Sequence, residues 1–396
     1  MRRRLWPLGV LILLSACTAA AEETPTITVT RTVPAPPMIE TPTAGPQPSA
    51  SDSDDEQGDD EDGDERRKPE NAVGVEVDAQ PPDTAPTDER VTCPSQGRTV
   101  STADALKVAL RNARPGTVIK LADGRYTGLF ETTASGTADR PIWLCGSPNA
   151  VLAGEGIKSG YVFHLDGAQH WRLVGFTVVD GQKGVMADGT TGTVIQGLTV
   201  HTIGDEGIHL RRHSVGNRVI ANRIHDTGLR RDKFGEGVYI GSAISNWCSL
   251  TDCQPDRSDR NIISANVIGP TTSEGIDVKE GTTRGILAGN RIDGSGTTAA
   301  DSLVDVKGTA WLIEGNIGLA APLDGFQTHQ IVPRWGERNL FRRNSVAGGP
   351  IPAEVAEKED TGKRYGFAFR PVAANVVTCD NTVTGGLALA NVPCRP

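Results

Sequence analysis

A short pattern recurs through residues 160–391: an aliphatic residue, two variable positions, Asn or Gly, one variable position, then another aliphatic residue. Asn266, Asn290, Asn316 and Asn344 mark four successive copies, which are separated by 24, 26 and 28 residues. Short alternating stretches bounded by Gly, Asn and Asp fill each copy, which is typical of strands and turns. One such repeat cannot bury its own apolar face, so the pattern predicts stacked coils with a shared core.

This pattern excludes the other repeat architectures. Helical solenoids need long stretches of 3.6-residue periodicity, which are absent after residue 115. The L-x-x-L-x-L signature of leucine-rich repeats is also missing. Asparagines at fixed positions fit an inward ladder at a turn, where backbone groups need partners. We therefore expect an all-β fold, a single-stranded parallel β-helix.

The start of the repeat region differs from the rest. Residues 101–128 open with a helical pattern, in which Ser101 or Thr102 is the N-cap and Leu106, Ala109 and Leu110 share one face. A strand and a Gly-rich turn follow. Because a helix at the end of a solenoid covers an otherwise open core, we expect an N-terminal helical cap.

Residues 98–180, which include this helix and the string RPIWLCGS, resemble the N-terminal part of right-handed parallel β-helix proteins of the pectate lyase type. They resemble in particular the family of alginate lyases and chondroitinase B. Further on, the strings EGIDVKEGTTRG, LVDVKG and DGFQTHQI resemble secreted β-helix proteins. The resemblance implies a right-handed helix and the cleavage of acidic polysaccharides.

The first 90 residues have a different character. Residues 1–17 combine three arginines, a short apolar run and the ending Leu-Ser-Ala-Cys, which resembles the lipobox of bacterial lipoproteins. An ordinary secretory signal is the alternative. Residues 18–90 are rich in Thr, Pro and acidic residues, so we expect a disordered tether. We predict export, lipidation of Cys17 at a membrane surface, and a folded domain at 91–396.

Charge and cysteines support this division. Residues 1–90 hold 19 acidic and 8 basic residues, which leaves 30 and 32 of the total 49 and 40 for the domain. A near-neutral domain does not favour nucleic-acid binding, and no feature predicts an oligomer. Without Cys17 six cysteines remain, an even number that is typical of disulfides in exported proteins. Closeness in sequence favours the pairs Cys248–Cys253 and Cys379–Cys394, which leaves Cys93–Cys145 as the third.

Strand alternation predicts which charged residues face outwards. In GIDVKEG the aliphatic residues Ile276 and Val278 point to the core, so Asp277 and Lys279 point away from it. Aligned copies then form three outward columns. The first column holds His209, Tyr239, Asp277, Asp305 and Gln327; the second Arg211, Gly241, Lys279, Lys307, His329 and Arg370; the third Glu206, Glu236, Glu274, Ser302 and Asp324.

The columns bring like charges together. Asp277 stacks on Asp305, and Lys279 on Lys307, with their backbones ~4.8 Å apart. Like charges at this distance cost roughly 3 kcal/mol at an effective dielectric near 20. A solvated charge ladder is one interpretation. The other is a functional site, in which carboxylates hold a cation and amines bind a polyanion.

The resemblance favours a polysaccharide lyase that cleaves uronate polymers by β-elimination. It implies that Glu274, Asp277 and Asp305, with Glu236, hold a divalent cation such as Ca²⁺. Lys279 then removes the C5 proton, with Lys307 or Arg211 as helper. The family pattern differs in places, because Glu274 and Asp277 are three residues apart and Lys279 is followed by Glu. The signatures of β-helix hydrolases (Asn-x-Asp, Asp-Asp, Gly-His-Gly) are absent from residues 91–396.

A non-catalytic protein of the cell surface is the alternative. It would bind glycans or serve a structural role, with His209, Tyr239, His329 and Trp335 contacting an acidic polysaccharide. Trp247 belongs to the same group of candidate sugar-stacking residues. The insertion at residues 241–260 interrupts the repeat beside the charged columns, where it is either the wall of a groove or a tolerated surface loop.

Overall fold

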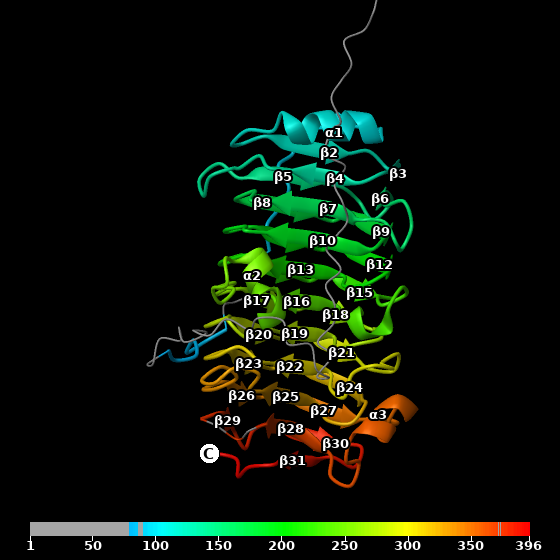
Figure 1. The fold of residues 1–396 in the computed structure, drawn as a ribbon. Coiled ribbons are helices and arrows are strands. Elements are labelled where there is room, and N and C mark those ends of the chain that lie inside the picture. Colours follow the sequence, from blue (N-terminus) through cyan, green and yellow to red (C-terminus); the bar gives the residue numbers. More distant parts are fainter. Residues whose placement is uncertain (1–78, 86–89, 371, 373) are drawn as a thin grey trace, which may run out of the picture. The chain divides into compact units, whose positions relative to one another are not determined.

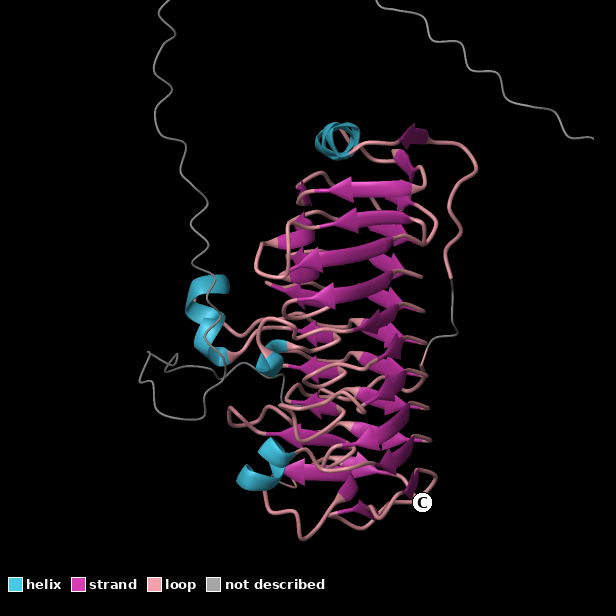
Figure 2. Ribbon diagram, turned by 90° about the vertical axis from the view of Figure 1, so that its right-hand side faces the viewer, coloured by secondary structure: helices cyan, strands magenta, loops and turns pink. Residues whose placement is uncertain are grey.

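The computed structural model describes residues 79–85, 90–370, 372 and 374–396. The predicted signal segment with Cys17, and most of the predicted tether, lie outside the described residues. The described chain winds into a parallel β-helix with three sheets (Figure 1). Strands make up its body, and the few short helices lie at its upper end and along its sides (Figure 2). No helix of these residues is long and apolar enough to cross a membrane.

Each coil contributes one strand to each sheet. Sheet A contains, in spatial order, β1 (Arg98–Val100), β2 (Val118–Leu121), β5 (Ile142–Cys145), β8 (Trp171–Val174), β11 (Val194–Gln196), β14 (Arg218–Ile220), β17 (Ile262–Ser264), β20 (Ile286–Ala288), β23 (Leu312–Glu314), β26 (Leu340–Arg342) and β29 (Val376–Val377). Sheet B contains β3 (Gly124–Thr127), β6 (Ala150–Ala153), β9 (Thr177–Gly181), β12 (Thr199–Ile203), β15 (Arg223–His225), β18 (Val267–Ile268), β21 (Arg291–Asp293), β24 (Ile317–Ala321), β27 (Ser345–Gly348) and β30 (Thr382–Thr384).

Sheet C forms the front of the molecule in Figure 1. It contains β4 (Phe130–Thr132), β7 (Tyr161–Asp166), β10 (Lys183–Asp188), β13 (Ile208–Arg211), β16 (Val238–Ile240), β19 (Ile276–Val278), β22 (Val304–Val306), β25 (Phe326–His329), β28 (Tyr365–Arg370) and β31 (Ala388–Ala390). The helices are α1 (Ala103–Arg111), α2 (Trp247–Leu250) and α3 (Ala353–Lys358), with 3₁₀ turns η1 (Asp232–Phe234) and η2 (Ile244–Asn246). The predicted all-β parallel solenoid is confirmed.

The asparagines form the predicted inward ladder. The side-chain amide of each donates to the side-chain oxygen of the next, 2.9–3.0 Å away, along Asn222, Asn266, Asn290, Asn316, Asn344 and Asn381. Each Nδ2 also donates to a backbone carbonyl, as Asn290 does to Ile263. The residue before each Asn from Asn222 to Asn344 takes a left-handed conformation, with φ +64° at Gly289 and +65° at Gly315. The recurring Gly-Asn pairs thus mark the bend between sheets A and B.

The first helix lies where the sequence predicts it. The Thr102 side chain accepts a hydrogen bond from the Ala105 amide at the start of α1, and Leu106 and Leu110 are fully buried in the core. All three predicted disulfides are present in the structure: Cys93–Cys145, Cys248–Cys253 and Cys379–Cys394. The first joins the segment before β1 to β5, the second closes the insertion, and the third holds the last coil.

The segment before β1 runs along the outer face of sheet A. Gln196 in β11 exchanges two hydrogen bonds with the backbone of Val91, and Arg342 in β26 donates to the Asp83 carbonyl. Arg342 and Gln196 belong to strands five steps apart in sheet A, a distance of ~24 Å along the stack. Asp83 therefore lies nearer the C-terminal coils than Val91 does.

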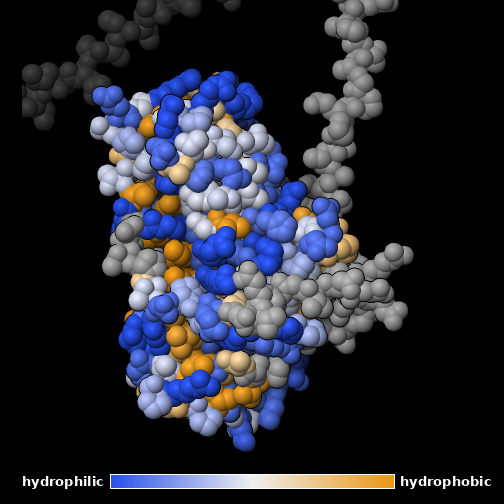
Figure 3. Space-filling view, turned by 90° about the vertical axis from the view of Figure 1, so that its left-hand side faces the viewer, coloured by the Kyte–Doolittle hydropathy of each residue, from blue (hydrophilic) through white to orange (hydrophobic). Residues whose placement is uncertain are grey.

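This segment lies on the face with outward apolar side chains. Ile286 and Leu312 point away from the core, next to each other across β20 and β23, yet only 6% and 0% of their surfaces are exposed. Figure 3 shows apolar surface running in a broken stripe along this side of the molecule. Ala79 is buried as well. Residues 79–85 of the predicted tether therefore pack on the β-helix.

Replacing Asn290 by Ala tests the ladder. The change leaves the amides of Asn266 without their acceptor inside the core, so we expect a loss of about 2–4 kcal/mol in the free energy of unfolding. Chemical denaturation measures it. Asn149→Ala removes an exposed asparagine and is the control. Equal stability of the two variants would contradict a structural role of the ladder.

Candidate functional site

The outer face of sheet C carries the predicted columns. The strand register aligns His209 with Tyr239, Tyr239 with Asp277, Asp277 with Asp305, and Asp305 with Gln327. Lys279 and Lys307 follow β19 and β22 at equivalent positions. The neighbouring Ile276, Val278, Val304 and Val306 point into the core, as alternation predicts.

Charges on this face alternate. Asp277 contacts the Nζ atoms of Lys279 and Lys307 at 3.2 and 3.1 Å, and Asp305 contacts Lys307 at 3.1 Å. His329 completes the series with Nδ1 2.9 Å from the Asp305 carboxylate. The repulsion that the sequence predicts is therefore offset, because each ammonium group lies between two carboxylates or beside one. Asp277, Lys279 and Asp305 are 2–3% exposed, so these ion pairs are screened only weakly by solvent.

Tyr239 lies next to this series. The Lys279 Nζ is 5.2 Å from the centre of its ring, and the His209 ring packs edge-on against it at 4.4 Å. His209 Nε2 donates to the Gly241 carbonyl at 2.9 Å, which fixes the imidazole. The two residues predicted to contact sugars are thus joined to Lys279 in one cluster.

Neighbouring charges determine the charge states of Lys307, Asp305 and His329 against the effect of burial. Burial alone would lower the pKa of Lys307, but Asp277 and Asp305 raise it well above its ordinary value. Burial alone would raise the pKa of Asp305, but His329 and Lys307 hold it well below its usual range. The carboxylate of Asp305 in turn raises the pKa of His329 to about 8. Lys307 and Asp305 therefore stay charged at neutral pH.

The third column consists of acids. Glu206, Glu236 and Glu274 occupy adjacent coils, as the amides of Gly207 and Gly237 donate to the carbonyls of Glu236 and Glu274. Burial, with the charges of Glu206 and Glu274, raises the pKa of Glu236 well above its ordinary value. Burial and Asp277 raise the pKa of Glu274 to about 7. Burial and the neighbouring acids thus favour the uncharged form of Glu236.

A second polar cluster lies higher on the same face. Arg211 donates to Asp188 at 2.7 Å and to the Tyr161 hydroxyl at 3.2 Å, and His164 contacts Asp188 at 2.9 Å. His164 and Arg211 hold the pKa of Asp188 well below its usual range, although burial opposes them. The sequence analysis missed His164 and Asp188. Their register beside Arg211 was the signal that could have found them.

The structure changes the metal hypothesis. Among the described residues, one group has ligand atoms within 4.8 Å of one another, and it consists of His164, Asp166 and Asp188. The predicted set, Glu274, Asp277, Asp305 and Glu236, is not such a group. Its two aspartates are paired with lysines, and burial raises the pKa of Glu236, which disfavours the charged form that binds a cation.

The insertion packs beside sheet C as a folded unit. Its Trp247 lies in a small apolar cluster with Val332 and Trp335, and the Ile244 amide donates to Glu280. Both indoles are 0% exposed. The prediction that Trp335 and Trp247 are sugar-stacking platforms is therefore not supported, because neither ring presents a face to a ligand.

The parallel β-helix with this site was compared with known families, curated proteins and solved structures. A scan against protein-family models and a search of curated proteins both found no match. Among solved structures, the chain is 33% identical to the alginate lyase from Paenibacillus sp. str. FPU-7, with a TM-score of 0.64, over 74% of this chain and 98% of that one. The chain belongs to the family of this alginate lyase, and the predicted resemblance is confirmed.

Other similar structures are more distant. A mannuronic acid specific polysaccharide family 6 lyase from human gut microbiota is 14% identical with a TM-score of 0.44, over 75% of this chain and 77% of that one. The A-module of a mannuronan C-5 epimerase from Azotobacter vinelandii is 13% identical with a TM-score of 0.44, over 75% of this chain and 90% of that one. We base no argument on them.

The His329–Asp305 pair predicts a pH-dependent stability. The folded state raises the pKa of His329 from 6.5 to about 8, so the stabilisation is complete below pH 6.5 and is lost as pH rises through about 8. We expect the melting temperature to fall over this window, and to fall less in His329→Gln. Thermal denaturation at a series of pH values from about 6 to about 9 measures it. An unchanged slope in the variant would contradict the assignment.

Proposed function

We propose that the protein is a polysaccharide lyase that cleaves a uronic-acid polymer by β-elimination, with alginate as the first substrate to test. Membership in the family of the Paenibacillus alginate lyase supports the substrate class. The observation that carries the proposal is the position of Lys279, which lies beside Tyr239 and shares Asp277 with a second lysine. This arrangement offers a base, a proton donor and a fixed positive charge on one rigid sheet.

The reaction needs two proton transfers and one broken bond. The amine of Lys279 takes the C5 proton of the uronate, and the electrons of that C–H bond form the C4–C5 double bond. The C4–O4 bond breaks, and O4 takes a proton from the hydroxyl group of Tyr239. Each group acts on an atom of the sugar from the outer face of sheet C, so both can reach the same residue of a bound chain.

Lys279 and Lys307 have different roles in the proposed reaction. Lys307 stays protonated because Asp277 and Asp305 hold its charge, so it is a poor base and a good partner for the substrate carboxylate. Neutralising that carboxylate makes the C5 proton more acidic. The positive charge of Lys307 favours the neutral amine form of Lys279. Asp277 favours the ammonium form, but it contacts both lysines. Lys279 is therefore the base, and Lys307 its electrostatic helper.

The remaining predicted residues take supporting roles. Glu236 has a buried Oε2 without a hydrogen-bond partner among the described residues, and as a carboxylic acid it can donate to a substrate oxygen. His209 fixes Tyr239 by packing against its ring. Arg211, together with His164, can bind a uronate further along the sheet. His329 stabilises Asp305 and through it the charge of Lys307.

A divalent cation does not fit the residues around Lys279. Asp277 and Asp305 already neutralise ammonium groups, and burial, which raises the pKa of Glu236, disfavours the carboxylate that a cation would bind. His164, Asp166 and Asp188 offer a better ligand geometry, but Arg211 already binds Asp188. We therefore assign no step of the reaction to Ca²⁺.

Export and anchoring complete the proposal. Three disulfides within the folded region support an oxidising compartment. We propose that Cys17 carries a lipid and that residues 18–78 link it to the β-helix at a cell surface. The glycan-binding alternative is weaker, because the two tryptophans that favoured it are buried.

Replacing Lys279 by Met tests the base. We expect turnover of alginate to fall by about 10²–10⁴-fold, the usual contribution of a general base, while binding persists. The ultraviolet absorbance of the unsaturated uronate measures the reaction. Lys363→Met, which removes an exposed lysine, is the control. Full activity of the Lys279 variant would refute the assignment and make Lys307 the next candidate. If the unchanged protein cleaves no uronate polymer, the proposed function itself is wrong.

Removing divalent cations tests whether Lys307 or a bound metal supplies the positive charge for the reaction. Because Lys307 supplies the positive charge, we expect dialysis against a chelator to leave the initial rate of alginate cleavage unchanged within about twofold. Adding Ca²⁺ back should have no effect either. A loss of activity that Ca²⁺ restores would contradict this mechanism and point to His164, Asp166 and Asp188.

A further inference from the structure

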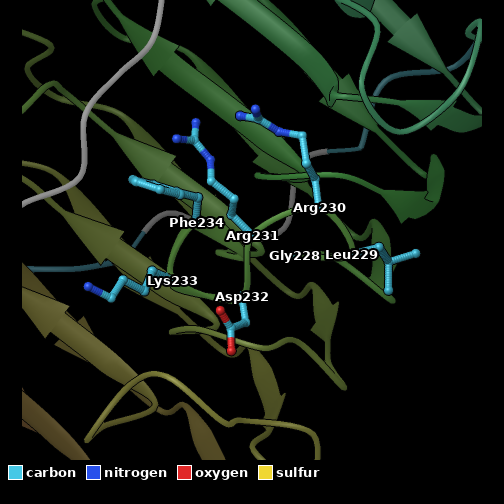
Figure 4. Close-up of a pocket in the computed structure, with 7 residues that line it drawn as sticks. All are labelled: Gly228, Leu229, Arg230, Arg231, Asp232, Lys233 and Phe234. Atoms are coloured by element: carbon cyan, nitrogen blue, oxygen red, sulfur yellow. The ribbon is translucent and has the colours of Figure 1, made fainter.

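The loop at residues 228–234 contains a hollow that the reaction does not use. It connects β15 to β16, the strand of Tyr239, and encloses about 460 Å³. Figure 4 shows that Arg230 and Arg231 extend on the same side of the loop, with Phe234 alongside Arg231. Three basic residues and one acidic residue lie in this short stretch, so the hollow is positively charged.

The loop is held firmly at its base. The Thr272 hydroxyl of the next coil donates to the Asp232 carbonyl at 2.8 Å, and the Thr227 hydroxyl donates to the Gly235 carbonyl at 2.6 Å. A Cβ atom at Gly228 would lie 1.7 Å from the Thr272 Oγ1, so only glycine permits this close packing. The cationic side chains therefore project from a fixed support.

The two arginines differ in their partners. Arg230 donates to the carboxylate of Asp205, which is 98% buried in its side chain, and this pair neutralises the charge. Arg231 instead lies over the ring of Phe234 at 4.3 Å. It makes no ion pair within the described residues, and its Nε is buried without a hydrogen-bond partner there. Stacking on an aromatic ring orients a guanidinium group and leaves its N–H edge for a ligand.

We propose that Arg231 binds the carboxylate of a uronate residue beyond the one that reacts, and so makes the enzyme favour long acidic chains. This inference rests on the proposed function. Phe234 is four residues before Val238, the first residue of β16, which carries Tyr239. Four residues span at most ~13 Å, so Phe234 lies within that distance of the start of the strand. Burial raises the pKa of Glu236 at this edge of the sheet, which favours an uncharged group beside the polymer.

Binding to the inactive Lys279→Met protein tests this subsite. Calorimetry compares the full-length protein with and without Arg231→Gln, using alginate polymer and a short alginate oligomer. We expect the second change to weaken polymer binding about tenfold, which corresponds to ~1.4 kcal/mol, and to leave oligomer binding unchanged. Arg291→Gln, which removes an exposed charge from sheet B, should have no effect on either ligand.

Three outcomes would overturn the subsite: unchanged polymer binding, equal losses for polymer and oligomer, or the same loss in Arg291→Gln. A melting temperature that falls in Arg231→Gln would show a structural role instead. If the Lys279→Met protein binds no uronate polymer at all, the result contradicts the proposed function rather than the subsite alone.

Discussion

Stacking of coils in parallel register governs this molecule, because it places like residues on like residues about 4.8 Å apart. For asparagines the constraint is favourable. An amide is both donor and acceptor, so Asn266, Asn290 and Asn316 bond to one another in a continuous ladder. For charges the same constraint is unfavourable, since identical ions repel. The structure offsets this repulsion because two columns of opposite charge lie side by side on sheet C. Lys307 there contacts both Asp277 and Asp305.

This solution also creates chemical differences between identical residues. Asp277-Val278-Lys279 and Asp305-Val306-Lys307 have the same sequence but different neighbours. Lys307 lies between two carboxylates, whereas Lys279 lies at the end of the series, under Tyr239. Asp305 thus contacts Lys307, while the ring of Tyr239 faces Lys279. We infer that the repeat makes one lysine a permanent cation and leaves the other to exchange protons.

Much of the fold could be predicted because it depends on local periodicity. Alternation placed Ile276 and Val278 in the core, and the Asn spacing predicted the ladder. Closeness in the chain predicted two disulfides, which left the third pair of cysteines. The site was harder, since side-chain rotamers decide which charges meet. His329 was identified as a weak sugar contact, whereas it pairs with Asp305. Trp335 was expected on the surface, but an insertion from another coil buries it. Such contacts join distant segments, and no local pattern reports them.

The claim that the two lysines differ in charge can be measured directly. Nuclear magnetic resonance of the side-chain Nζ groups, assigned by comparison with Lys279→Met and Lys307→Met, follows each amine as the pH rises. The account predicts that Lys307 keeps its proton beyond pH 10.5, its ordinary pKa, because Asp277 and Asp305 hold the ammonium form. A Lys307 that loses its proton at or below pH 10.5, while Lys279 remains charged, would contradict it.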